Sequence, residues 1–205
     1  SVLLSEAFGW RSKAVNYLKI RGGWSQVGAD ANPYQLATVF TSETAFNGNP
    51  LQSSSTIGMN SNLKPENTSS IEAGFEAAFW DNRLYLDFTY YKTDSRNQIL
   101  KLATTAASGY TSQVRNAGHI RNRGYEIQLG AVPIQTSKGF RWNLDLNYGA
   151  NSSKVVKLDD EGLITSYQLY SSGIQILASV GEAYGTLFGT SYVRDANGNV
   201  VVDAN

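Results

Sequence analysis

Charged residues recur in segments where apolar or small residues fill the positions on either side. The charged residues are Lys19, Arg21, Glu72, Glu76, Asp87, Glu126, Arg141 and Asp145. In an extended strand, alternate residues point to the same face, so each segment would carry its charges on one side only. Facing an enclosed interior, these groups could line the path of a polar solute. The other interpretation, which we favour, is that they form cross-strand ion pairs.

Catalytic or metal-binding chemistry has little support in the sequence. His119 is the sole histidine and lies among arginines, but no orienting partner or nucleophile can be assigned to it, so we expect a packing role. The acids at 159–161 are expected to be solvated. Residues 195–199 imitate the start of a calcium loop, but Gly198 stands at the fourth place instead of the sixth, which indicates a turn. The chain also lacks cysteine, which excludes a thiolate metal site. With no supporting constellation of acids, Ser-His or metal ligands, we expect no enzymatic activity, no metal and no cofactor.

Six aromatic residues lie in segments that resemble long loops rich in Asn, Gln and Ser. They are Tyr34, Phe40, Phe46, Tyr110, Tyr167 and Tyr170. Flat rings exposed beside such polar groups are suited to stacking on the faces of sugars. They are equally suited to packing long loops against one another, and the sequence leaves both roles open.

The clearest structural signal is the alternation at 140–151, which predicts a β-strand with one apolar and one polar face. Its even positions are Phe140, Trp142, Leu144, Leu146, Tyr148 and Ala150. Eleven steps of ~3.3 Å, tilted by ~40°, rise roughly 28 Å, close to the ~25 Å apolar band of an outer-membrane barrel. The aromatic residues lie toward the two ends, as an interface–hydrocarbon–interface crossing requires.

Four further strands are predicted at 17–27, 69–80, 83–93 and 124–133, and a sixth near 184–194. The connections between them alternate between long and short, with a tight hairpin at Asp81–Asn82 and another turn at Asn197–Gly198. Outer-membrane barrels place short turns on the periplasmic rim and long loops outside. The predicted class is therefore all-β, an antiparallel up-and-down transmembrane barrel segment.

Composition narrows the class of protein further. Lys plus Arg and Asp plus Glu balance at 17 each, so nothing suggests a nucleic-acid partner. No apolar run approaches the ~18 residues of a spanning helix. If the chain lies in a membrane, a closed barrel is the only strand arrangement that satisfies its backbone in lipid.

Several segments resemble the SusC/RagA-like TonB-dependent outer-membrane transporters. They are 18–28 (LKIRGGWSQVG), 63–68 (LKPENT) followed by Glu72 and Gly74, 116–126 (NAGHIRNRGYE) and 180–189 (VGEAYGTLFG). The matches run in order over most of the chain, although Ala29 and Ala183 stand where the family often has Asn and Pro. Proline presets its own φ and extends the residue before it, so we expect the motif at 65–68 to fix how the chain re-enters the barrel.

The resemblance implies a 22-stranded barrel, of which residues 1–205 would supply about six to eight strands, with the plug domain, TonB box and signal peptide outside this chain. The inward charges would then also hold the plug. The resemblance further implies TonB-energised import of glycans or peptides across the outer membrane of a Gram-negative bacterium. The expected partners are outer-membrane lipid, a SusD-like lipoprotein, TonB and an oligosaccharide or peptide substrate.

The rival interpretation is a soluble β-sandwich, such as a carbohydrate-binding module. It explains the alternation and the aromatic residues, but it requires a second sheet over the row that contains Trp142, Leu144 and Leu146.

Overall fold

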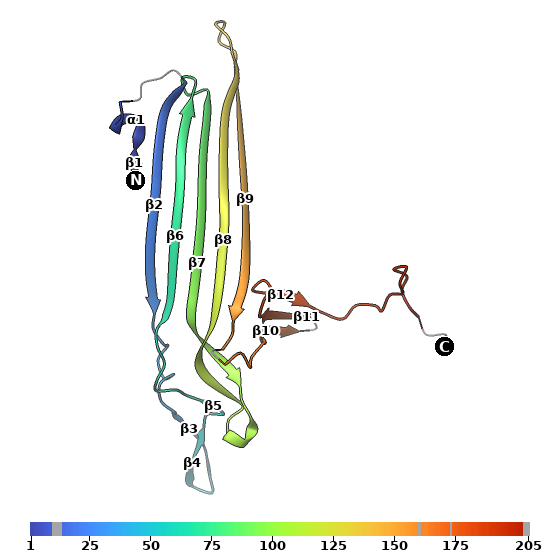
Figure 1. Ribbon diagram of the computed structural model, residues 1–205. Helices are drawn as coiled ribbons and strands as arrows, with labels where there is room; N and C mark the ends of the chain where they lie inside the picture. The colour runs from blue at the N-terminus through green and yellow to red at the C-terminus, as the bar shows by residue number, and fades with distance from the viewer. Residues whose placement is uncertain (10–13, 160, 173, 203–205) are drawn as a thin grey trace.

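The computed structural model describes residues 1–9, 14–159, 161–172 and 174–202, and it is dominated by one tall antiparallel sheet (Figure 1). Its five long strands are β2 (Val15–Ala29), β6 (Glu66–Phe79), β7 (Leu84–Ala103), β8 (Ser112–Gln135) and β9 (Arg141–Lys157). The short strand β1 (Val2–Leu3) pairs with β2, and β5 (Ile57–Gly58) pairs with β8. The five strands predicted between residues 17 and 151 are confirmed, and most run further than expected.

The register aligns like residues in rows across the sheet. Ile20, Phe75, Phe88, Ile127 and Tyr148 pair in one row, and Leu18, Ala77, Leu86, Leu129 and Leu146 pair in the next. We call this side of the sheet the apolar face. The opposite side, which carries Lys19, Arg21, Glu76 and Asp87, is the polar face.

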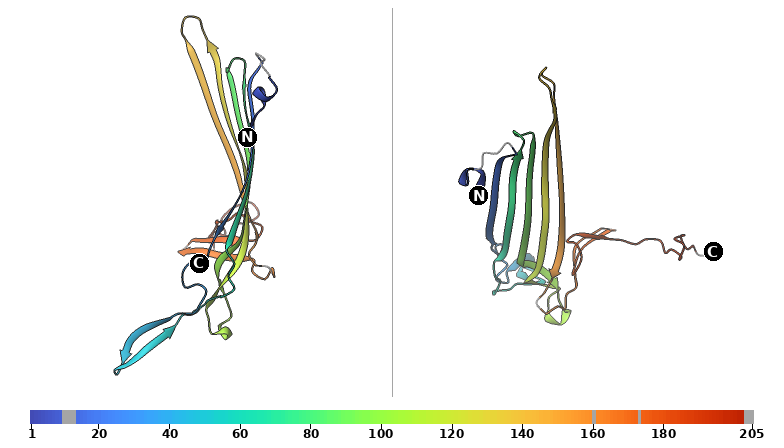
Figure 2. Two further views of the ribbon diagram at one scale, coloured as in Figure 1. Left: turned by 90° about the vertical axis from the view of Figure 1, so that its left-hand side faces the viewer. Right: turned by 45° about the horizontal axis from the view of Figure 1, so that its top comes forward.

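No second layer covers the apolar face within the described residues. Trp24, Ile71, Leu146 and Tyr148 are between 52% and 67% exposed, and Figure 2 shows the sheet nearly edge-on as a single curved layer. An apolar surface of this extent is unusual on a soluble monomer and marks contact with lipid or protein. The β-sandwich interpretation is therefore wrong, because the second sheet that it requires is absent from the described residues. Neither α1 (Leu4–Ala7) nor the 3₁₀ helix η1 (Ala106–Ser108) is long and apolar enough to span a membrane.

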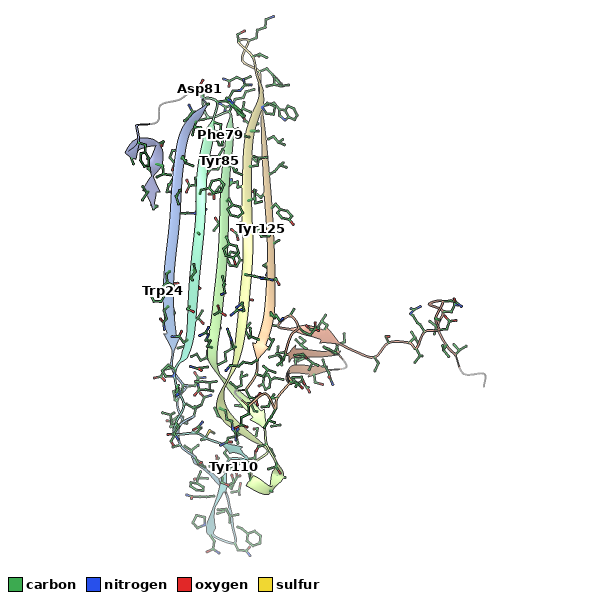
Figure 3. The ribbon with its side chains drawn as sticks, viewed as in Figure 1. Trp24, Phe79, Asp81, Tyr85, Tyr110 and Tyr125 are labelled. Carbon is green, nitrogen blue, oxygen red and sulfur yellow. The ribbon has the colours of Figure 1, made fainter. Side chains whose placement is uncertain are left out.

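Aromatic residues border the apolar face at both ends, as Phe79 and Trp24 show in Figure 3. Trp142 lies beside the short turns, whereas Trp24 lies in the row that ends at Ser152 of β9. From Trp142 to Ser152, ten steps of ~3.3 Å tilted by ~40° rise about 25 Å, which is the height of the apolar band of an outer-membrane barrel.

Short turns join β6 to β7 and β8 to β9 at the same end of the sheet (Figure 1). In the first, Trp80, Asp81 and Asn82 have φ values of 53°, 56° and 62°, which are uncommon outside glycine. Asn16 of β2 supports them, because its Nδ2 donates to Asp81 Oδ1 at 3.5 Å and its Oδ1 accepts from the Asn82 N–H at 3.3 Å. The hairpin predicted at Asp81–Asn82 is confirmed.

The prediction of a long loop between the strands at 83–93 and 124–133 is wrong. β7 and β8 continue as a paired ribbon well past the apolar face, and only residues 104–111 join them. The ribbon has polar and apolar residues on both faces. It therefore lacks the alternation from which strands were predicted, although backbone pairing does not depend on that alternation.

Two small sheets occupy other segments that were expected to be loops. β3 (Phe40–Phe46) pairs with β4 (Asn49–Ser54), and β10 (Ser166–Ser172), β11 (Ile174–Ser179) and β12 (Thr186–Phe188) form a three-stranded sheet. The sixth strand predicted at 184–194 is wrong, because only β12 is extended there and it pairs with β11. Gly185 has a φ of 85°, a left-handed value that interrupts a strand. The turn at Asn197–Gly198 is confirmed by the bridge between Arg194 and Val200, away from the main sheet.

The chain returns to the main sheet through a set of hydrogen bonds centred on Asn116 of β8. Asn116 Oδ1 accepts from the Lys64 N–H at 2.7 Å, and its Nδ2 donates to the carbonyl oxygens of Lys64 at 2.6 Å and Asn97 at 2.9 Å. Glu66 Oε1 accepts from the Ile99 N–H at 2.8 Å. The chain thus re-enters the sheet at 65–68 tied to the β7–β8 ribbon by hydrogen bonds that the sequence did not indicate.

Two glycines leave room for large side chains that cross the polar face. A Cβ on Gly74 would lie 2.5 Å from the Phe88 carbonyl oxygen and 3.1 Å from Arg21 Nε. A Cβ on Gly124 would lie 2.6 Å from both the Ala150 carbonyl oxygen and Tyr91 Oη. A side chain at either position would displace backbone, so steric crowding favours glycine at both. Gly74 and Gly124 belong to two of the segments that carry the resemblance described from the sequence.

We predict that Asn116→Ala destabilises the full-length protein by about 1–2 kcal/mol, because three backbone groups lose a partner. Denaturant unfolding in detergent micelles measures the effect. Asn122→Ala is the matched control on the same strand, since no hydrogen bond of its side chain is found in the described part of the chain. Equal loss of stability in the two variants would contradict the assigned role.

Gly124→Ala is expected to cost about 1–3 kcal/mol, because the new methyl group overlaps the backbone of β9. Gly23→Ala serves as the control, since it lies in the same cross-strand row and a Cβ there meets nothing within 4 Å. Thermal unfolding of the two full-length variants compares them. A neutral Gly124→Ala would show that the close approach is relieved at no cost.

Candidate functional site

The polar face is the candidate site, because register and alternation place all eight predicted charged residues on it. Lys19 and Arg21 lie on β2, Glu72 and Glu76 on β6, Asp87 on β7, Glu126 on β8, and Arg141 and Asp145 on β9. For seven of the eight, the shared face follows from the strand period of two and an uninterrupted register through their rows. Arg141 lies beyond a register shift between Ala131 and Ile134 of β8, but it continues the alternation of β9 from Asp145.

Four of these residues form a compact charge cluster, made of Lys19, Arg21, Glu76 and Asp87. Glu76 Oε1 lies 2.9 Å from Lys19 Nζ and 2.7 Å from Arg21 Nη1, and Arg21 Nη2 lies 2.5 Å from Asp87 Oδ1. Arg21 also donates to the Thr89 hydroxyl. The side chains in these ion pairs are between 16% and 31% exposed, and the two cations balance the two carboxylates.

The other four predicted residues stay outside this cluster. Glu72, Glu126 and Asp145 make no side-chain hydrogen bond or ion pair with the described residues, and Arg141 donates only to Asn143 Oδ1, at 2.9 Å. The structure therefore divides the polar face into charges neutralised within the wall and charges left available to another molecule. Cross-strand pairing, the interpretation favoured from sequence, applies to the first group only.

A shallow depression of about 430 Å³ lies beside the charge cluster. Its polar lining comes from Arg21, Asp87, Thr89, Glu126, Gln128 and Asn147. Carboxylate, amide and hydroxyl groups meet there without an apolar lid, so the surface can hydrogen-bond a polar solute or the polar side of a protein segment. Thr89 was not predicted from the sequence, because it lies across Gly74 from Arg21, two strands away, in a register that a single sequence does not reveal.

The six predicted aromatic residues divide between exposed and packed positions. Tyr34, Phe40, Phe46 and Tyr170 are at least 57% exposed, and Phe40 and Phe46 lie on β3 instead of in a loop. Tyr110 packs over Gly58, where a Cβ would lie 3.1 Å from its ring. Tyr167 packs against the small core of Val155, Leu158 and Ala178. Packing thus explains two of the six, and four remain free to contact another molecule.

His119 and the turn at 195–199 both have structural roles. His119 is 8% exposed, and its Nε2 lies 2.6 Å from Asp94 Oδ1. The Asp195 carboxylate accepts from the backbone N–H groups of Asn197 and Asn199, and the bond from Asn199 lowers the pKa of Asp195 below its ordinary value. No group of three potential metal ligands occurs in the residues that the structure describes. Of the three predicted solvated acids at 159–161, Asp160 lies outside the described residues.

Comparison with known proteins gives one consistent family. The family described as "TonB dependent receptor-like, beta-barrel" matches residues 5–203. The TonB-dependent receptor P3 of Formosa agariphila is 31% identical over 204 residues, which cover 92% of this chain and 20% of that protein. The TonB-dependent receptor SusC of Bacteroides thetaiotaomicron is 29% identical over 231 residues, which cover 98% of this chain and 23% of SusC. The chain thus spans about a fifth of the length of these relatives.

Solved structures show the same fold. The RagAB peptide transporter aligns with a TM-score of 0.71 at 22% identity, over 88% of this chain and 19% of that one. The RagAB peptide importer in its closed-closed state aligns with a TM-score of 0.74 at 21% identity, over 99% of this chain and 24% of that one. With a family match along almost the whole described chain, this chain belongs to the TonB-dependent receptor β-barrel family, of which it forms a barrel fragment.

Proposed function

We propose that residues 1–205 are part of the wall and outer loops of an outer-membrane transporter that imports its substrate with energy delivered by TonB. The observation that carries the proposal is the uncovered apolar face, bordered by aromatic residues at both ends and backed by a polar face rich in charge. A barrel wall in lipid needs both surfaces at once. The plug domain and TonB box would belong to other parts of the same protein, and the location to a Gram-negative outer membrane.

The two groups of charge on the polar face support different roles. The charge cluster is internally neutral and bonded across three strands, which suits a wall element. Glu126 and Asp145 face the interior without partners among the described residues. We infer that they contact the plug or the passing substrate, where a polar partner would offset their charge.

Glycans and peptides both fit as substrates. The exposed rings of Tyr34, Phe40, Phe46 and Tyr170 favour stacking on sugars, and SusC is a relative. The structural neighbour RagAB is described as a peptide transporter. A SusD-like lipoprotein would cover the outer segments that carry these rings, as the similarity to SusC suggests.

The function is tested by uptake into cells that produce the full-length protein. Deleting its gene, or removing TonB, should abolish energised uptake of a fluorescent oligosaccharide or peptide from the natural growth substrate. Uptake that survives either deletion would overturn the proposal.

Glu76→Gln and Glu126→Gln should separate stability from transport. We expect Glu76→Gln to lower the free energy of unfolding by about 1–2 kcal/mol, since it leaves Lys19 and Arg21 short of a carboxylate that is only partly exposed. Glu126→Gln should leave stability within about 0.5 kcal/mol, because no described group pairs with it, and should change uptake several-fold. Denaturant unfolding and initial uptake rates measure the two effects, and the reverse pattern would contradict the division into two groups.

A further inference from the structure

We propose that the apolar face ends in a binding surface for the phosphorylated headgroups of membrane lipids, formed by Lys92, Arg121, Arg123 and Lys154. Lys92 pairs with Arg123, and Arg121 pairs with Lys154, in two adjacent rows of β7, β8 and β9. Alternation places all four on the same side of the sheet as Phe88, Ile127 and Tyr148, so they point away from the polar face. No role was predicted for these four residues from the sequence.

The height of these cations along the strands matches the headgroup region. Lys92 and Arg123 share the row of Trp24, which lies about 25 Å above Trp142 by the estimate given for the apolar band. Arg121 and Lys154 lie two residues further, or about 5 Å higher. Phosphates of an anionic leaflet lie just beyond the hydrocarbon, where each nearby Lys or Arg adds to binding.

A buried carboxylate orients part of the surface before any ligand arrives. Asp94 is 8% exposed, and its Oδ1 accepts from Arg121 Nε at 2.8 Å while its Oδ2 lies 3.5 Å from Lys92 Nζ. His119 Nε2 lies 2.6 Å from the same oxygen, Asp94 Oδ1, and helps to hold the carboxylate in place. This geometry leaves the Nη atoms of Arg121 without a partner in the described chain, and the side chains of Arg123 and Lys154 likewise make no hydrogen bond there.

Charge and shape both select an anionic lipid. The surface holds four cations and one carboxylate, which contacts only Lys92 and Arg121 of the four, so it keeps a net positive charge. Guanidinium groups bind phosphate through two parallel hydrogen bonds. A depression of about 390 Å³ lies next to Arg123, lined also by Tyr90, Tyr125, Ala150 and Ser152. Its lining is mostly apolar, which suits the upper part of an acyl chain. A headgroup phosphate with an attached chain would satisfy both features, whereas free phosphate would use only the first.

The test compares the full-length protein in nanodiscs of phosphatidylcholine alone, with added diphosphoryl lipid A, or with lipid A whose phosphates have been removed. We expect diphosphoryl lipid A to raise the midpoint of thermal unfolding above the value in the other two discs. The double variant Arg123→Gln/Lys154→Gln should lose most of this rise and bind diphosphoryl lipid A roughly tenfold more weakly. Its midpoint in phosphatidylcholine should stay unchanged, because the bonds of Asp94 remain intact.

Lys101→Gln/Lys138→Gln is the matched control, with the same change in charge at exposed positions outside this surface. It should keep the full rise. The proposal is overturned if the Arg123/Lys154 variant also keeps it, or if phosphate-free lipid A stabilises equally well. An equal rise on adding inorganic phosphate to phosphatidylcholine discs would overturn the assignment to a lipid.

Discussion

In hydrocarbon, a backbone N–H or C=O group has no water to bond, so each strand of this sheet must pair along its whole buried length. That pairing sets the register of β2, β6, β7, β8 and β9, and the register fixes which side chains share a face. A slip of one residue in one strand would carry its charges to the lipid side. Depending on the strand that slips, Arg21 of β2, Glu76 of β6 or Asp87 of β7 would then face acyl chains, which makes the register the most strongly specified property of the wall.

The charge cluster and the aromatic borders are consequences of that register. Arg21 reaches both Glu76 and Asp87 because three neighbouring strands present these residues at adjacent levels, with Gly74 leaving the space between them. Phe75 and Phe88, paired on the other side, have ring centroids 5.7 Å apart. The sheet thus separates polar and apolar contacts across a single layer. Along the apolar face, β9 pairs with β8 but with no other strand of the described residues, and this edge would pair with a further strand in a closed barrel.

The sequence alone was sufficient for the strands that alternate, for the exposed apolar face and for the tight hairpin at Asp81–Asn82. It failed where alternation stops, in the β7–β8 ribbon and the hairpin of β3 and β4, because backbone pairing there proceeds without a consistent inner and outer face. The eight charged residues do share one face of the sheet, and that this face lines an interior stays a proposal. Their division into a paired cluster and unpaired acids depends on cross-strand neighbours, which a single sequence does not align. The same limit hid Asp94, whose partners His119 and Arg121 are more than twenty residues away.

The orientation of the two faces is tested most directly by spin labels on adjacent residues, Leu146→Cys and Asn147→Cys, in the full-length protein in liposomes. Residues 1–205 contain no cysteine, and any cysteine elsewhere in the full-length protein is first replaced by serine. The account predicts that the label at 146 collides mainly with lipid-dissolved oxygen, and the label at 147 mainly with a water-soluble nickel complex. The reverse preference, or equal behaviour at both positions, would show that the apolar face does not meet lipid.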